Sequence, residues 1–314
     1  MKEPVRYIER ETGELLTEKI AGEDALRFCY ENPLGKILLE LIVKWPWLST
    51  LYGIYQDSDF SKSKITQFIR ELSIDENEAE KPVNQYANFN EFFARKLKPE
   101  ARPICPDEDR FIMPGDGRVS VIPKIEKDRV FHIKGVDFKL SDFLSDSNLA
   151  KEYEGGSLVV VRLCPADYHR FHFPYAGTPS EAQRIAGVLY SVNPIALWRQ
   201  PSLFCENERV LIPFDLSNGQ KIMLVDVGAT MVGKIHQTYI PGNKVKKAEE
   251  RGYFTFGAST TVIVFPPNCI QFDLDLVTNS SKGIETLCKM GSSLGICLDD
   301  AKLSEASIDL AEVI

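Results

Sequence analysis

The chain has 314 residues, with 37 basic and 45 acidic side chains and a formal net charge of −8. Hydrophobic residues make up 44% of it and charged residues 26%, which excludes a wholly disordered chain or a small disulfide-stapled scaffold. The acidic balance argues against a nucleic-acid partner held by bulk charge. Seven cysteines without a CxxC pair indicate reduced thiols. We expect neither a signal peptide nor a membrane-spanning stretch of about 20 residues.

Residues 1–105 are predicted to be mainly helical. From Leu34 to Val43 apolar residues occupy most of a helical surface, and Trp45 and Trp47 follow directly. Such a helix can pack on a protein core, or it can lie on a membrane with its indole rings at the level of the headgroups. The sequence leaves both interpretations open.

Beyond about residue 106 the pattern changes to short β-branched runs separated by Gly, Pro and Asn. Such runs predict strands, and the clearest are 118–122, 157–161, 221–225 and 260–265. The predicted fold class is therefore α+β. We expect an N-terminal helical, membrane-facing region (1–105), a β-rich catalytic domain resembling a barrel or sandwich (106–297) and an acidic tail (298–314).

Two of the four histidines lie close together in the segment from Cys164 to Pro174, as His169 and His172. Histidine suits proton transfer because its ordinary pKa of about 6.5 is close to neutral pH. Spacing alone does not distinguish a catalytic pair from two structural residues. A metal site would need a third ligand, and no candidate lies nearby in the sequence.

An acid and a hydroxyl occur in two further loop-like segments. Asp116 lies between two glycines before a predicted strand, and Ser259 follows Gly257 and Ala258 at the start of another. A tight turn and a β-bulge are the ordinary interpretations of these strings. An acid, a histidine and a serine on three loops of one domain are also the parts of an activated nucleophile.

At this point the sequence resembles the pyruvoyl-dependent phosphatidylserine decarboxylase family. The similarity covers nearly the whole chain except the acidic tail. It is carried by the order and spacing of eight strings, which are FNEFFARKLKPEARPI (90–104), PGDGRV (114–119), PADYHRFHFPYAG (165–177), SVNPIAL (191–197), ENERV (206–210), VGATMVGKI (227–235), PGNKVKKAEERGYFTFGAST (241–260) and ETLCKMGSSLG (285–295).

The resemblance implies that the precursor cuts itself between Ala258 and Ser259. Asp116 would orient His172, and His172 would take the proton from Ser259, whose oxygen attacks the carbonyl carbon of residue 258. Ser259 then becomes a pyruvoyl group, which forms a Schiff base with phosphatidylserine and releases CO2 to give phosphatidylethanolamine. His169 or His172 would return a proton to the product, and the resemblance does not separate the two.

The residue before the serine departs from the family pattern, since Ala258 stands where the family usually has glycine. If the backbone there requires a positive φ, a Cβ costs about 1–2 kcal/mol. We therefore expect cleavage that still occurs but is slow.

The resemblance also supplies expected partners and a location. The substrate would be phosphatidylserine in a membrane, and the β and α chains would be residues 1–258 and 259–314 of one precursor. A homodimer and a peripheral position on the cytoplasmic face of the cell membrane are expected.

Two other functions remain possible at this stage. A serine hydrolase could use Ser259, His172 and Asp116 without self-cleavage, although no G-x-S-x-G elbow is present. A non-enzymatic carrier of the lipoyl or biotinyl type could present Lys246 or Lys247 at a hairpin tip.

Overall fold

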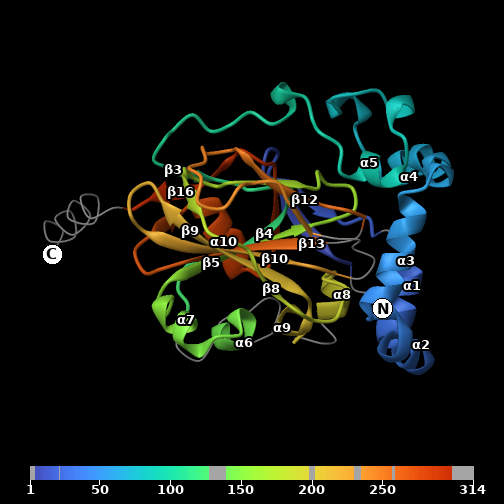
Figure 1. The fold of residues 1–314 in the computed structure, drawn as a ribbon, viewed down its shortest axis with the longest axis horizontal. Helices are drawn as coiled ribbons and strands as arrows, with labels where there is room; N and C mark the ends of the chain where they lie inside the picture. The colour runs from blue at the N-terminus through green and yellow to red at the C-terminus, as the bar shows by residue number, and fades with distance from the viewer. Residues whose placement is uncertain are drawn as a thin grey trace, which may run out of the picture.

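A computed structural model describes residues 4–20, 22–126, 139–197, 202–229, 235–256 and 259–298. The described part is a mixed α+β structure with ten helices besides the shorter helical turns (Figure 1). The strands are β1 (Arg6–Glu9), β2 (Leu15–Thr17), β3 (Arg110–Ile112), β4 (Gly117–Ile122), β5 (Ser157–Leu163), β6 (Arg170–His172), β7 (Gly177–Pro179), β8 (Gln183–Ile185), β9 (Arg209–Leu216), β10 (Lys221–Val227), β11 (Ile235–Gln237), β12 (Glu250–Phe254), β13 (Ser259–Phe265), β14 (Ile270–Phe272), β15 (Glu285–Cys288) and β16 (Ser293–Cys297). The helices are α1 (Glu23–Glu31), α2 (Pro33–Leu38), α3 (Pro46–Gln56), α4 (Ile65–Leu72), α5 (Phe89–Phe93), α6 (Leu140–Leu144), α7 (Ser147–Glu152), α8 (Pro194–Leu197), α9 (Leu203–Glu206) and α10 (Leu274–Ser281).

The strands form one large sheet and two small ones. The large sheet runs in the order β2-β1-β15-β4-β5-β13-β10-β9-β7, and β8 also pairs with β9. Its pairings are antiparallel except that of β1 with β15. The small sheets are β11-β12-β6 and β14-β16-β3. Among the described residues no sheet closes on itself, so the expectation of a barrel is wrong, whereas the α+β class is confirmed.

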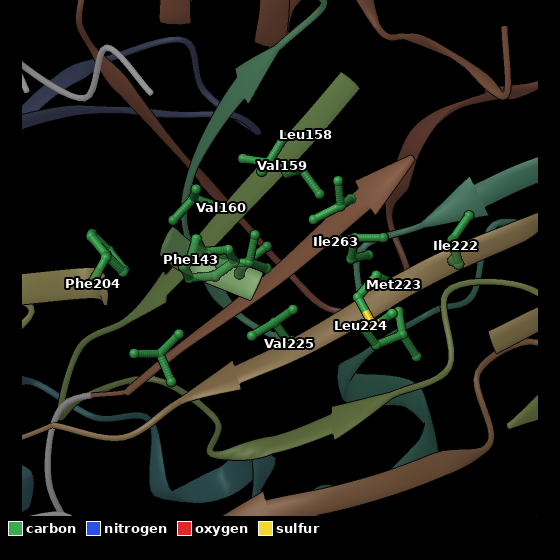
Figure 2. Close-up of a cluster of buried hydrophobic side chains, with 14 of the residues drawn as sticks. Phe143, Leu158, Val159, Val160, Phe204, Ile222, Met223, Leu224, Val225 and Ile263 are labelled. Carbon is green, nitrogen blue, oxygen red and sulfur yellow. The ribbon is translucent and has the colours of Figure 1, made fainter. Parts of the chain in front are cut away.

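The core lies on both faces of the large sheet. Every residue of β5 and β13 is buried, which explains why these strands appear in the sequence as continuous apolar runs and not as alternating patterns. Phe143 of α6 and Phe204 of α9 belong to the same buried cluster as Val160 of β5 and Val225 of β10 (Figure 2). All four predicted strands are present, within one or two residues of their expected ends.

The N-terminal helices stand together at one side of the β-rich part (Figure 1). Asn32 caps α2 by accepting hydrogen bonds from the backbone of Leu34 and Gly35, and a π-helix, Leu39–Val43, continues α2. Pro46 then begins α3. The predicted helix from Leu34 to Val43 is therefore present.

Two elements differ from the sequence-based expectation. The first residues form a hairpin, β1-β2, at the edge of the large sheet, because β1 pairs with β15 from the other end of the chain. Helix α10 packs on β4 and β15 within the region expected to be β-rich. Both depend on contacts between segments far apart in the sequence, and no local pattern announces them.

Candidate active site

The histidine motif and Ser259 approach one another through strand pairing. The motif begins where β5 ends and finishes in β6, which pairs with β12. The backbone N–H of Phe254, the last residue of β12, donates to the carbonyl of His169 at 3.0 Å. The chain then returns through β13, whose first residue, Ser259, pairs with Leu163 at the end of β5. The fold thus brings both ends of the histidine loop to the segment that contains the predicted cleavage point.

Ser259 is fully buried at the start of β13. Its Oγ has no hydrogen-bond partner within the described residues. Burying a hydroxyl without a partner costs about 1–3 kcal/mol, so native proteins rarely leave one in this state without a reason. The arrangement fits a nucleophile kept out of water. Ala258, the other residue of the predicted cleavage site, lies outside the described residues.

His172 is held by two hydrogen bonds. Its Nδ1 lies 2.9 Å from the carbonyl oxygen of Ala248, which can only accept, so Nδ1 carries the proton. Its Nε2 is then the acceptor and receives the hydroxyl of Tyr168 at 3.2 Å. Burial lowers the pKa of His172 from its ordinary 6.5, against the opposing effect of the Glu250 and Asp116 charges. The imidazole is therefore neutral and basic near pH 7.

Asp116 does not contact His172 in the way the resemblance implies. Its carboxylate accepts from Arg102 Nε at 2.8 Å and from the backbone N–H of Met290 at 2.8 Å. No hydrogen bond or ion pair joins the side chains of Asp116 and His172 in the described part of the chain. Asp116 acts on His172 only through its charge, which favours the protonated imidazole.

His169 is also fully buried, and its ring is fixed from two sides. Its Nδ1 donates to the carbonyl oxygen of Asp167 at 2.9 Å, which makes Nε2 the basic nitrogen of the neutral ring. The ring of Phe93, from α5, lies 3.9 Å from the imidazole, centroid to centroid. Helix α5 therefore contacts the histidine loop directly.

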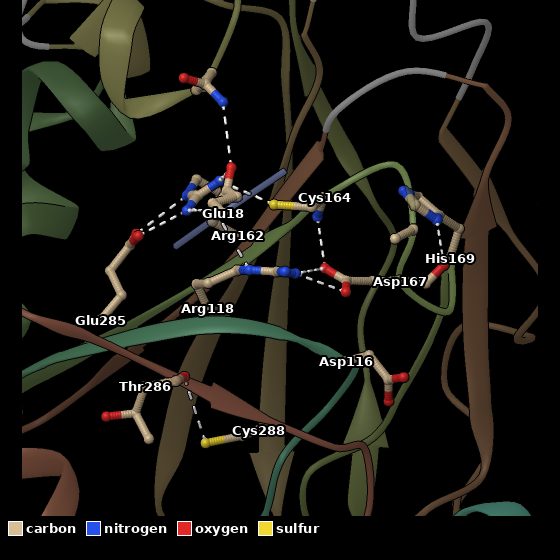
Figure 3. A network of polar contacts seen from close by, with 12 residues as sticks. Glu18, Asp116, Arg118, Arg162, Cys164, Asp167, His169, Glu285, Thr286 and Cys288 are labelled. Carbon is tan, nitrogen blue, oxygen red and sulfur yellow. Dashed lines mark hydrogen bonds and ion pairs between the residues drawn. The ribbon is translucent and has the colours of Figure 1, made fainter. Parts of the chain in front are cut away.

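A buried ionic network surrounds the start of the histidine loop (Figure 3). Arg118 of β4 donates to Asp167 at 2.6 Å, and the other carboxylate oxygen of Asp167 accepts from the backbone N–H of Cys164 at 2.6 Å. Burial raises the pKa of Asp167, and the positive charge of Arg118 opposes that shift. The pair fixes the loop on which His169 lies.

The second half of this network joins three segments of the chain. Arg162 of β5 donates to Glu18 at 2.7 Å and to Glu285 at 2.6 Å. Burial alone would raise the pKa of Glu18, but Arg162 and Arg118 outweigh it and lower the pKa to about 2. Glu18 therefore stays ionised, and the N-terminal hairpin is tied to the centre of the sheet.

Sequence reasoning missed these charged residues. The signal for Arg118 and Arg162 was present, because each is a cation within an apolar strand run, and such a charge needs a buried partner. Glu18, Arg102 and Asp167 carry no comparable signal. Their roles follow only from the segments that the fold places beside them.

The surface next to the site is strongly apolar. We call it the α2–α3 surface, and it consists of the exposed side chains of Leu34, Ile37, Leu38, Leu41, Ile42, Trp45, Trp47, Leu51, Ile54 and Tyr55. In the described part of the chain no single helix has the length and hydropathy to span a bilayer. Pro33–Ile42 and Trp47–Gln56 meet those criteria only as a pair, with an 83° bend between them.

The two lysines that a carrier protein would use, Lys246 and Lys247, belong to a segment that makes its own contacts with the rest of the chain. Lys247 donates to the backbone carbonyl of Asp107, and the backbone N–H of Lys246 donates to Glu249. Within the described ranges no three His, Cys, Asp or Glu side chains are grouped so as to hold a metal ion. The strand pairings bring the histidine loop and the start of β13 together, but among the described residues no hydrogen bond joins Ser259 to His169 or His172.

Comparison with known proteins gives one consistent result. The sequence profile described as phosphatidylserine decarboxylase matches residues 89–296. The phosphatidylserine decarboxylase proenzyme of Clostridium perfringens is 46% identical over 291 residues, which are 93% of this chain and 99% of that protein. The proenzymes of Fusobacterium nucleatum and Ruminiclostridium cellulolyticum are 45% and 41% identical, over 93% and 94% of this chain and 98% of each relative.

Proposed function

The chain belongs to the phosphatidylserine decarboxylase family and is a carboxy-lyase, and from this premise we propose that it makes its own pyruvoyl group from Ser259. The single observation that carries the proposal is the buried Ser259 hydroxyl, which has no hydrogen-bond partner within the described residues. Ser259 is the first residue of β13, the strand that directly follows the predicted cleavage point. A hydroxyl kept out of water and without a competing hydrogen bond suits attack on the preceding carbonyl carbon.

In the proposed cleavage, His172 is the base. Its neutral form is favoured by burial, and its Nε2 is the nitrogen that can accept a proton. The Ser259 oxygen attacks the carbonyl carbon of residue 258 and converts the peptide bond into an ester. Loss of the Ser259 Cα proton then expels residue 258 as a carboxylate, and hydrolysis of the remaining enamine releases ammonia. Asp116 stabilises the protonated His172 through space, since its own hydrogen bonds go to Arg102 and Met290.

In the proposed decarboxylation, His169 is the proton donor. When formed, the pyruvoyl group supplies an electron sink for the charge left at Cα, as pyridoxal phosphate does in other enzymes. His169 is buried, and Asp167 fixes its tautomer with Nε2 as the proton-exchanging nitrogen. Loss of such a donor typically lowers a rate by about 10²–10⁴-fold.

We further propose that the α2–α3 surface lies on the membrane that contains the substrate. Its apolar side chains are exposed, and two tryptophans stand at the bend between the helices. Indole rings favour the headgroup level of a bilayer. The cytoplasmic face and the homodimer remain predictions. Size-exclusion chromatography with light scattering tests the dimer.

A denaturing gel with intact mass measurement tests the proposed cleavage. The wild-type chain should give two pieces, residues 1–258 and 259–314, and the smaller should be lighter than its unmodified sequence by one ammonia. Ser259→Ala should stay intact and release no CO2 from phosphatidylserine. A wild-type chain that remains in one piece while hydrolysing esters would favour the serine hydrolase.

Ala258→Gly refines the same experiment. If residue 258 needs a positive φ, removing its Cβ relieves about 1–2 kcal/mol and should speed cleavage by about tenfold, at about 1.4 kcal/mol per tenfold. An unchanged cleavage rate would refute the strain argument and leave the proposed chemistry intact.

A further inference from the structure

A cavity of about 240 Å³ lies between the N-terminal helices and the strand that leads to Ser259. Helix α3 contributes Gly53 and Ile54, and Asp57 caps its C-terminus. The other lining residues include Asn90 of α5, His236 of β11 and Tyr253 of β12. We call it the α3 pocket. Neither the proposed cleavage nor the proposed proton transfers use any of these side chains.

The α3 pocket opens beside the α2–α3 surface. Ile54 belongs to both, and 63% of its surface is exposed. Asp57, three residues further along, is exposed as well, whereas Gly53, which also lines the pocket, is buried. A molecule whose apolar part rests on the α2–α3 surface can therefore place a polar end in the pocket.

The floor of the pocket connects to the site. Asn90 is buried, and its Nδ2 donates to Asp57 Oδ1 at 2.8 Å. Its Oδ1 accepts from the backbone N–H of Phe256 at 3.0 Å, three residues before Ser259. One side chain thus joins the carboxylate at the mouth to the segment that ends at the reacting residue.

The lining offers a group for an ammonium. Asp57 supplies a carboxylate, and the opposite wall carries the stacked rings of His236 and Tyr253, with ring centroids 4.6 Å apart and planes at 13°. Pockets for drug-sized ligands measure about 300–1,000 Å³, so this one suits a headgroup but no acyl chain.

From these features we propose that the α3 pocket binds the ammonium end of a phospholipid headgroup on its way from the bilayer to Ser259. The ammonium group binds the carboxylate of Asp57. The inference rests on the proposed function for its substrate, but the binding itself can be measured without turnover.

The kinetic test uses the processed full-length protein and phosphatidylserine in mixed micelles. Asp57→Asn should raise the KM for phosphatidylserine by about tenfold or more, the loss expected for one charge-assisted hydrogen bond. Asp59→Asn is the matched control, because Asp59 is an exposed acid two residues away that does not line the pocket. It should leave KM unchanged. Equal KM values for the two variants would overturn the proposal.

The binding test uses water-soluble glycerophosphoserine and glycerophosphoethanolamine, with glycerol phosphate as the ligand that lacks an amine. The wild-type protein should bind both amine-bearing compounds more tightly than glycerol phosphate, by ligand-observed NMR. Asp57→Asn should remove this preference.

These two tests separate the pocket from the proposed function. A wild-type protein that binds the amine-bearing ligands through Asp57 but releases no CO2 would retain the pocket and refute the proposed function. CO2 release without an Asp57-dependent preference would refute the pocket alone. Binding of the soluble ligands with no effect of Asp57→Asn on KM in micelles would overturn the assignment to a lipid headgroup.

Discussion

The α2–α3 surface exposes apolar side chains, and the interior of the large sheet buries charged ones. Both are the reverse of what is usual in a globular protein. Leu41 and Ile54 on the helices are 68% and 63% exposed, whereas Arg162 and Glu18 in the sheet are almost completely buried. Apolar side chains in water and charges in a core each cost free energy unless something compensates. In the sheet the compensation is visible, since Arg162 meets the carboxylates of Glu18 and Glu285. On the helices the compensating partner is the proposed bilayer.

The two regions meet at the histidine loop. Phe93 of α5 packs on His169 from the helical side, and Arg118 holds Asp167 from the sheet side. The candidate site therefore lies where the N-terminal helices meet the buried ionic network of the large sheet. Substitutions on either side can test whether the bilayer compensates the exposed apolar residues and whether the ion pairs compensate the buried charges.

The largest effect should come from making the helices polar. Leu41→Ser combined with Ile54→Ser should lower the affinity for phosphatidylserine-containing vesicles by at least about 100-fold, because burying each such side chain contributes about 1.5–3 kcal/mol. Liposome flotation measures the bound fraction. Leu274→Ser is the control, since Leu274 is 79% exposed but lies on α10, outside this surface. Unaltered flotation of the double variant would contradict membrane docking.

Breaking the buried ionic network should lower the free energy of unfolding by somewhat less than the double variant lowers the free energy of vesicle binding. Arg162→Met leaves Glu18 and Glu285 without their cation, and removing one partner of a buried ion pair typically destabilises a protein by about 3–5 kcal/mol. Urea unfolding followed by circular dichroism gives the free energy of unfolding. Lys289→Met removes an exposed pair with Glu11 and should change it by less than about 1 kcal/mol. Similar losses in both variants would show that the network does not stabilise the sheet.

The smallest effect is the pH dependence of His172. Burial lowers its pKa below 6.5, so the neutral base persists as the pH falls through 6.5 and is lost only below the lowered pKa. The unfolded chain binds the extra proton in that range, so folded stability falls with pH there too. Cleavage rates of freshly translated precursor between pH 5 and 8 should show a midpoint below 6.5. A midpoint at or above 6.5 would mean that His172 is not the base or is not buried in the precursor.

The local sequence was sufficient for much of the fold. Continuous β-branched runs predicted β4, β5, β10 and β13, and helical spacing predicted the helix from Leu34 to Val43, because these patterns depend on neighbours within a few residues. The local sequence did not predict the hairpin of β1 and β2, because β15, the strand that pairs with β1, is more than 270 residues away. It also suggested a barrel, because strand patterns do not specify whether the two edges of a sheet meet.

For the candidate site, too, some features could be predicted from the sequence and others only from the tertiary structure. The sequence by itself predicted which residues carry chemistry, since Asp116, His169, His172 and Ser259 are the reactive side chains within recognisable strings. Only the tertiary structure decided their partners: Asp116 pairs with Arg102, and His172 binds Tyr168 and the backbone of Ala248. The physical reason is that reactivity belongs to a residue type. Hydrogen bonds and burial, which tune that reactivity, depend on segments that only folding brings together.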